Sequence, residues 1–235
     1  MNAARESPGP KASPVNEAQI ISDLPREQRN FLFKSAVRRR YAKGNILFAP
    51  GDRSSFVYYI IRGRVKISNL TGEGEEIIFR FCGPHNLFGL STIFGGQARE
   101  VFAHAVADTE VHCIRRESLE KLTLRNPRFA IDVIHVLGHR LRHAHSAITE
   151  FAVGDVRSRI AQLLEKFAQM SSTTKDGVVH IDNKFTHQDM AHMIGATRTT
   201  VTKVINDWKR RGLIRIARGR IVILDYPAIR ALIHR

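Results

Sequence analysis

Residues 185–201 read FTHQDMAHMIGATRTTV, and this stretch predicts two short helices joined by a tight turn. Thr186 followed three residues later by Asp189 forms a capping box, with Asp in place of the usual Glu or Gln. The box begins a helix over residues 187–194, and Gly195 supplies the turn that ends it. The pattern indicates a helix-turn-helix.

The second predicted helix begins after its cap Thr197, runs to Arg211 and stops at Gly212. Its apolar positions recur at helical spacing and form an inward face: Val201, Val204, Ile205 and Trp208. Its first turns carry polar residues that point outward: Arg198, Thr199, Thr202 and Lys203. The N-terminus of such a helix can enter the major groove, where arginine pairs with guanine. Threonine hydroxyls and free N–H groups at the cap can hold phosphate.

A predicted hairpin follows the second helix. Residues 213–217 and 221–224 alternate in hydropathy around Arg218-Gly219-Arg220, which gives the hairpin a basic tip. The motif is therefore predicted to be a winged helix-turn-helix over residues 154–235. This segment holds 15 Lys and Arg against 7 Asp and Glu, which is +8 of the total +15. Such a surplus suits a polyanionic partner. The alternative is an ordinary helical hairpin with a solvated basic face.

Upstream of the motif, apolar residues alternate at spacings of four and three, as in a coiled-coil seam. The seam consists of Ala130, Ile134, Leu137, Leu141, Ala144, Ile148 and Phe151. Charged and histidine side chains flank it, so the apolar stripe is narrow. We predict a dimerisation helix over 127–153 that forms a parallel homodimer, with a hinge at Gly154. The alternative is a helix that packs only on its own domain.

The N-terminal half shows the period of β-structure. Residues 1–17 are rich in Pro, Ser and Ala and predict a disordered tail, and residues 20–39 show a short helical pattern. Short predicted strands with turn signals between them follow at 45–48, 56–61, 64–67 and 76–81, with two more within 101–114. The prediction is an α+β protein with an antiparallel β-roll (a double-stranded β-helix) at 18–126.

The rest of the composition excludes several classes. The sequence has no apolar signal segment at its start and no stretch long enough to span a membrane, and Cys82 and Cys113 are too few for a disulfide framework. A cytoplasmic protein without membrane contact is expected. No P-loop, nucleophile elbow or H-E-x-x-H is present, so we predict no enzyme, no catalytic residue and no metal site.

The order of β-roll, long helix and winged helix-turn-helix resembles the Crp/Fnr superfamily of bacterial transcription regulators, and within it the nitrogen-control branch of cyanobacteria. Gly51, Gly63 and Phe88-Gly89 fall where the cyclic-nucleotide-binding roll keeps its turns. The resemblance implies RNA polymerase as a further partner. A regulatory subunit that acts on a protein partner, as such rolls do in kinases, is the rival interpretation.

The resemblance also implies roles for single residues. The positions that match base-reading residues are Arg198, Thr199 and Lys203. The positions that match phosphate-holding residues are Thr186, Gln188, Thr197 and Thr200. Many members carry Glu where this chain has Thr199, and Glu accepts from cytosine N4. The half-site should therefore differ from TGTGA. The nitrogen-control branch also lacks that Glu and reads GTA-type sites.

The sequence leaves the identity of the effector open. The resemblance places a pocket at Phe88, Gly89, Leu90, Ser91, Arg99 and Arg140. Leu90 replaces the Glu that holds the ribose of cyclic AMP, Glu100 would repel its phosphate, and Ala144 and His145 replace its adenine contacts, so cyclic AMP is not expected. Two cysteines exclude an iron–sulfur cluster of the Fnr type. Haem on His104, His135, His139 or His143, 2-oxoglutarate, and no ligand at all stay open.

Overall fold

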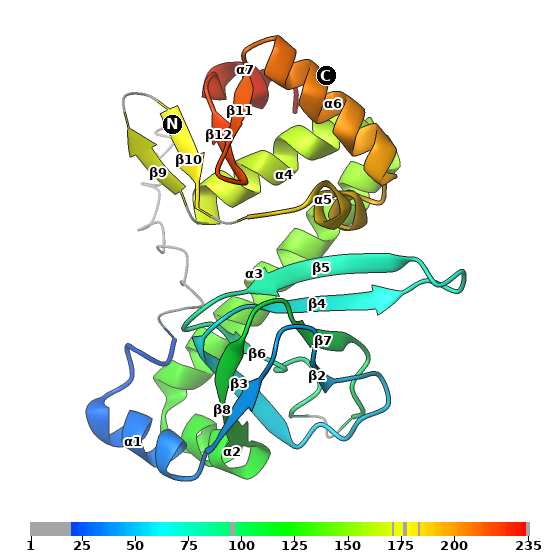
Figure 1. The fold of residues 1–235 in the computed structure, drawn as a ribbon. Helices are drawn as coiled ribbons and strands as arrows, with labels where there is room; N and C mark the ends of the chain where they lie inside the picture. Colours follow the sequence, from blue (N-terminus) through cyan, green and yellow to red (C-terminus); the bar gives the residue numbers. More distant parts are fainter. Residues whose placement is uncertain (1–19, 95–96, 171, 176–177, 183, 234–235) are drawn as a thin grey trace, which may run out of the picture.

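The computed structural model of the chain describes residues 20–94, 97–170, 172–175, 178–182 and 184–233. These residues form a β-roll, a long helix and a C-terminal part of helices and short strands, as the sequence predicts (Figure 1). The predicted tail at 1–17 lies outside the described residues.

Two antiparallel four-stranded sheets face each other in the roll, with strand orders β1-β8-β3-β6 and β2-β7-β4-β5. Apolar side chains alternate along the strands and meet between the sheets, where Phe48, Ile60, Phe88 and Val111 are buried. The strands are β1 (Val37–Tyr41), β2 (Ile46–Phe48), β3 (Phe56–Arg62), β4 (Val65–Leu70), β5 (Glu76–Cys82), β6 (Leu87–Phe88), β7 (Phe102–Ala105) and β8 (Thr109–Arg115).

The helical pattern predicted for residues 20–39 is confirmed only for the middle of that range. Helix α1 spans only Arg26–Lys34, and β1 begins at Val37. The arginines of β1 explain the strand, because Arg38 and Arg40 reach across to the buried carboxylate of Glu110 on β8 at 2.5 and 3.1 Å. Arg62 of β3 donates to the same carboxylate at 2.9 Å, so three strands share one ion-pair cluster.

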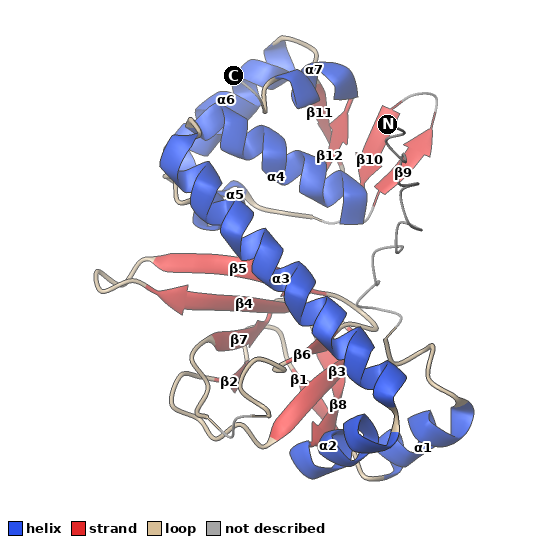
Figure 2. Ribbon diagram, turned by 180° about the vertical axis from the view of Figure 1, so that it is seen from behind, coloured by secondary structure: helices blue, strands red, loops and turns tan. Residues whose placement is uncertain are grey.

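The long helix α3 (Pro127–Val153) leaves the roll and reaches the C-terminal part (Figure 2). Its first half packs on the roll beside α1 and α2 (Arg116–Arg125), where Phe129, Val133 and Val136 are buried. Another stripe of the same helix, which includes Ile134, Leu141 and Ile148, is exposed in the single chain. Among the described helices, none combines the length and apolar character that crossing a lipid bilayer requires.

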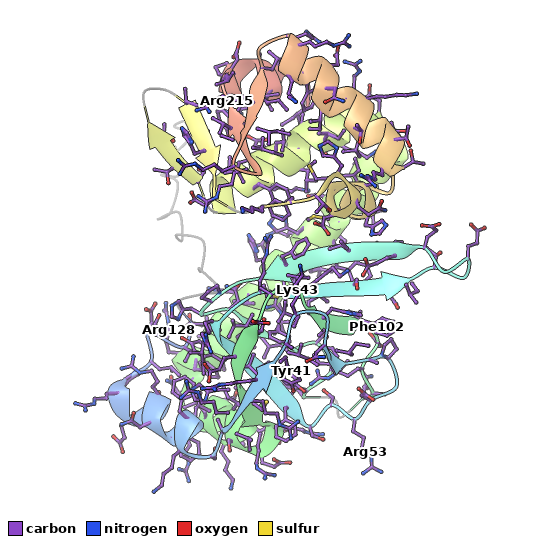
Figure 3. The ribbon with its side chains drawn as sticks, viewed as in Figure 1. Tyr41, Lys43, Arg53, Phe102, Arg128 and Arg215 are labelled. Atoms are coloured by element: carbon purple, nitrogen blue, oxygen red, sulfur yellow. The ribbon has the colours of Figure 1, made fainter. Side chains whose placement is uncertain are left out.

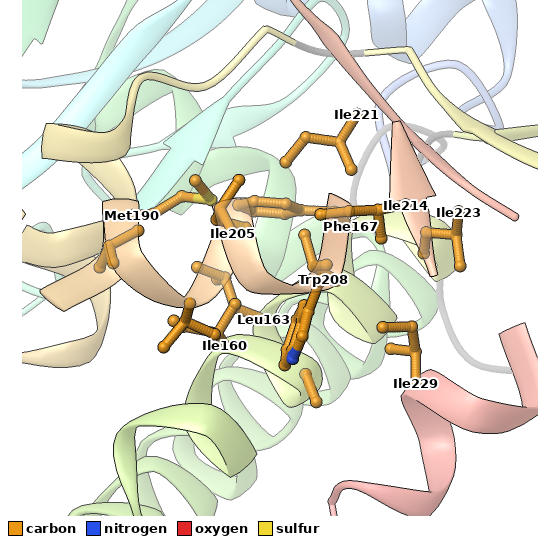
Figure 4. Packing of buried hydrophobic residues seen from close by; sticks show 14 of the residues in the cluster. Ile160, Leu163, Phe167, Met190, Ile205, Trp208, Ile214, Ile221, Ile223 and Ile229 are labelled. Atoms are coloured by element: carbon orange, nitrogen blue, oxygen red, sulfur yellow. The ribbon is translucent and has the colours of Figure 1, made fainter. Parts of the chain in front are cut away.

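The C-terminal part has its own hydrophobic core. Trp208, Phe167, Met190, Ile205 and Ile229 are among its buried residues (Figure 4). The inward face predicted for the second helix of the motif is buried at all four positions. The elements are α4 (Val156–Met170), β9 (Ser172–Lys175), β10 (Val178–Ile181), α5 (His187–Ile194), α6 (Arg198–Arg210), β11 (Ile214–Ala217), β12 (Arg220–Ile223) and α7 (Tyr226–Ala231). The small sheet has the order β11-β12-β10-β9.

Candidate nucleic-acid interface

The capping box at the start of α5 is formed as predicted. The Asp189 backbone N–H donates to the Thr186 hydroxyl at 3.0 Å, and the Asp189 carboxylate accepts from the Thr186 backbone N–H at 2.9 Å. Gly195 then takes the left-handed conformation (φ 58°) and ends the helix. The chain therefore turns sharply from α5 into α6.

The N-terminus of α6 is held by a second threonine cap. The Thr197 hydroxyl accepts from the Thr200 backbone N–H at 3.2 Å and lies 2.9 Å from the Thr200 hydroxyl. The first turn contains no acidic residue, so the positive end of the helix dipole stays uncompensated there. Such an end attracts phosphate.

Arg198, Thr199 and Lys203 are exposed on the side of α6 opposite to its buried face. Within the described residues, Arg198 and Lys203 form no ion pair. At the far end of the helix, Asp207 pairs with Arg157 at 3.0 Å and also contacts Arg210 and Arg211. One carboxylate thus offsets part of the positive charge at the C-terminal end of α6, whereas no described acidic residue lies in the first turn at its N-terminal end.

Two other predicted contact residues are engaged by neighbouring side chains. The Thr202 hydroxyl lies 2.9 Å from Nδ1 of His187, and Thr202 is half-buried. The amide of Gln188 contacts the imidazole of His192 one turn further along α5, although Gln188 remains exposed. Sequence reasoning missed the pairing of His187 with Thr202, because the two residues belong to different helices.

The predicted wing is formed by β11 and β12. Arg218 and Gly219 both have positive φ (51° and 75°) at its tip, which makes the turn tight. The Lys184 side chain lies beside Gly219, so a second cation adjoins the tip. Arg215 projects from β11 and is exposed (Figure 3), a further basic residue of the wing that sequence reasoning did not single out.

The roll contacts the C-terminal part through α5. The Glu76 carboxylate of β5 lies between Lys66 Nζ at 2.7 Å and His192 Nδ1 at 3.2 Å. The pKa of Glu76 is lowered, because the hydrogen bonds from Lys66, Ser68 and His192 outweigh the effect of burial.

An aromatic contact supports the same junction. The Arg64 guanidinium lies 4.4 Å from the ring centroids of both Phe81 and Phe185, and it donates to the Lys184 carbonyl at 3.1 Å. Burial lowers the pKa of Arg64.

Phe88, Leu90 and Arg99 of the predicted effector site are buried in the roll, and the Arg99 guanidinium is already hydrogen-bonded. Arg99 is 4% exposed, and its guanidinium donates to the Gly89 carbonyl at 2.8 Å, to the Thr92 hydroxyl at 3.1 Å and to the Phe56 carbonyl. Phe88 and Leu90 are buried, whereas Ser91 is exposed.

Helix α3 touches the same segment, because Arg140 donates to the Leu87 carbonyl at 2.8 Å. Of the histidines considered for haem, His139 and His143 contact each other at 3.1 Å between their Nε2 atoms. His104 lies on β7 in the roll, and burial and Lys66 lower its pKa.

Comparisons with known proteins agree with this architecture. Residues 38–126 match the cyclic nucleotide-binding domain family, and residues 158–232 match the Crp-like helix-turn-helix domain. The global nitrogen regulator of Synechococcus elongatus is 32% identical over 193 residues, which cover 81% of this chain and 86% of that protein. A CRP-like cAMP-activated global transcriptional regulator of Mycobacterium tuberculosis is 29% identical over 185 residues, with 79% and 83% covered.

Solved structures show the same fold. FixK2 from Bradyrhizobium japonicum superposes with a TM-score of 0.74 at 22% identity, covering 84% of this chain and 96% of that one. A CRP/FNR family transcriptional regulator of Thermus thermophilus gives a TM-score of 0.67 at 26% identity, with 85% and 99% covered. This chain therefore belongs to the Crp/Fnr family and is a transcription regulator with a helix-turn-helix DNA-binding domain.

Proposed function

We propose that the protein works as a homodimer that reads a near-palindromic DNA site through the N-termini of its two α6 helices. The observation that carries this proposal is the cluster at the start of α6, where a capped helix end adjoins exposed Arg198, Thr199 and Lys203. A dimer with two-fold symmetry would place the two reading helices about 34 Å apart, in successive major grooves.

The exposed stripe of α3 supports the dimer. Three of the predicted seam residues are large, apolar and exposed: Ile134, Leu141 and Ile148. Ala130 and Leu137 are half-buried, Ala144 is exposed, and the Phe151 side chain lies outside the described residues. A stripe of this kind is expected to be covered by a partner, and a second α3 offers the matching seam.

Within the site, Arg198 is proposed to read guanine and Lys203 to contact a neighbouring base. The hydroxyls and N–H groups of Thr186, Gln188, Thr197 and Thr200 are proposed to hold phosphates, with Arg218 of the wing beside them. Replacing Arg198 by Ala should weaken binding to the selected site by about 1–3 kcal/mol and relax base preference at one position. Equal loss on selected and random DNA would make Arg198 a phosphate contact instead.

We propose that cyclic AMP does not bind at the predicted effector site. The arginine that would neutralise a cyclic phosphate already donates to Gly89, Thr92 and Phe56, and Leu90 occupies the place of the ribose-binding Glu. Any ligand at this site would act near Gly89, Arg99 and Arg140, and its signal would reach RNA polymerase through occupancy of the DNA site.

Selection of binding sites from random DNA by the full chain tests the proposal. A two-fold symmetric consensus is expected, and its half-site should differ from TGTGA because Thr199 cannot accept a hydrogen bond in the manner of Glu. A single unrepeated half-site would contradict the dimer. Affinity for the selected site should then be measured with cyclic AMP, 2-oxoglutarate and haem in turn. Unchanged affinity with all three would indicate a constitutive DNA binder.

A further inference from the structure

One hydrogen bond joins the two helices of the reading motif at the edge of its exposed face. His187 is the first residue of α5, and its Nδ1 lies 2.9 Å from the Thr202 hydroxyl of α6. Both residues are half-buried. Thr202 follows the exposed Thr199 by three residues and precedes the exposed Lys203. On a helix this places its hydroxyl beside the residues proposed to meet the bases.

The chemistry of the pair depends on the state of the imidazole. A threonine hydroxyl has one proton to donate and two lone pairs, whereas a neutral imidazole has one donor and one acceptor nitrogen. If Nδ1 accepts, the Thr202 hydroxyl donates its only proton to His187. It can then only accept a hydrogen bond from DNA, for example from a base amino group. If Nδ1 carries a proton, Thr202 keeps its own proton for guanine O6, guanine N7, thymine O4 or a phosphate oxygen.

The charges around His187 favour the neutral ring in the free protein. Burial lowers the pKa of His187, and the nearby cations Arg198 and Lys209 of α6 lower it further. Asp189, on the same turn of α5, is held by the hydroxyl and the backbone N–H of Thr186. Phosphates that approach the N-terminus of α6 reverse the local potential and so favour a proton on the ring.

We propose that His187 is a positioning residue that sets the direction in which Thr202 hydrogen-bonds to DNA, so that DNA binding takes up a proton at His187. The inference rests on the proposed DNA-reading function. With both ring nitrogens protonated, His187 can only donate, and Thr202 then presents a donor to a base or phosphate acceptor. Affinity for the selected site should therefore increase as the pH falls.

The test measures the dissociation constant of the full chain for its selected site by fluorescence anisotropy between about pH 5.5 and 8.5. Wild type should bind more tightly at low pH, and His187→Gln, which cannot titrate, should lose that dependence. His180→Gln is the matched control, because His180 is a half-buried histidine of the same domain on β10. It should keep the wild-type pH profile.

Thr202 variants separate this role from a merely structural one. Thr202→Val should weaken binding about three- to tenfold, the effect of one lost hydrogen bond, and should lose the pH dependence. Thr202→Ser should restore both, and the Trp208 fluorescence of each variant checks that the fold is retained.

A wild-type pH profile in His187→Gln, or unchanged affinity in Thr202→Val, would overturn this inference and leave the proposed function in place. A wild type that binds no DNA at any pH would overturn the proposed function, and this inference with it.

Discussion

Replacing Leu141 by alanine should weaken the homodimer without unfolding the protomer. Leu141 lies on the exposed stripe of α3 and is 57% exposed in the single chain. Little of the protomer's own core therefore depends on it. In a parallel dimer its side chain would pack against the facing helix at the centre of the seam.

The magnitude follows from the area that the dimer would cover. Full burial of a leucine contributes about 1.5–3 kcal/mol, so covering the exposed part contributes about 0.9–1.7 kcal/mol in each protomer. Removing this side chain from both protomers would therefore reduce the free energy of dimerisation by about 2–3 kcal/mol. Since alanine keeps one methyl group, the dissociation constant of the dimer should rise about ten- to hundredfold.

Sedimentation velocity over a dilution series measures this constant directly. Leu124→Ala is the matched control, because Leu124 is 85% exposed but lies on α2, away from the seam. The control should leave the dimer unchanged. If Leu141→Ala and Leu124→Ala dissociate at the same concentration as wild type, the stripe is not the interface and the proposed seam on α3 is wrong.

Three further predictions concern the fold and the junction between its parts. Hydrogen bonds from the three arginines lower the pKa of Glu110 to about 2, so its charge stabilises the fold above the unfolded pKa of about 4.3 and that contribution is lost as the pH falls. Glu110→Gln should therefore be less stable than wild type in urea at pH 6, and a gap of equal size at pH 3 would contradict this. Arg64→Ala removes the cation that contacts both Phe81 and Phe185, so amide hydrogen exchange in α5 should become faster. Unchanged protection of α5 would show that this contact does not stabilise the junction. Trp208→Ala should cost about 3–5 kcal/mol of unfolding free energy, measured by circular dichroism, because the ring is fully buried; a cost below about 1 kcal/mol would mean that the site collapses around the smaller side chain.

The winged helix-turn-helix was predictable because its signals are local. The capping box of Thr186 and Asp189, the left-handed Gly195 and the turn at Arg218 each depend on residues within three or four positions of one another. Such signals are visible in one sequence. The spacing of the apolar stripe on α3 is equally local, since every residue of the stripe belongs to one helix, but its use as a dimer seam stays a prediction.

Elements without local signals were missed. Helix α2 begins at Arg116 with no side-chain cap, so no start signal precedes it. Strand β1 reads VRRRY, and the partner of its Arg38 and Arg40 is the carboxylate of Glu110, about seventy residues away. The same holds for Arg99, whose carbonyl partners at Phe56 and Gly89 follow no sequence pattern. Long-range polar pairing is therefore the part that a single sequence leaves open.

Two sets of contacts connect the roll to the seam and to α6, through which it is proposed to act on DNA. The short segment 87–89 contacts both arginines of the predicted effector site, because Arg140 donates to the Leu87 carbonyl and Arg99 donates to the Gly89 carbonyl. Arg140 directly precedes Leu141 of the exposed stripe, so a shift of this segment acts on the proposed seam. A second route runs from β5 through His192 to α5. Since the bond between His187 and Thr202 joins α5 to α6, we expect a displacement of α5 on β5 to move the N-terminus of α6 as well. We therefore expect changes in dimer packing and in DNA affinity to be linked, because both routes begin in the same roll.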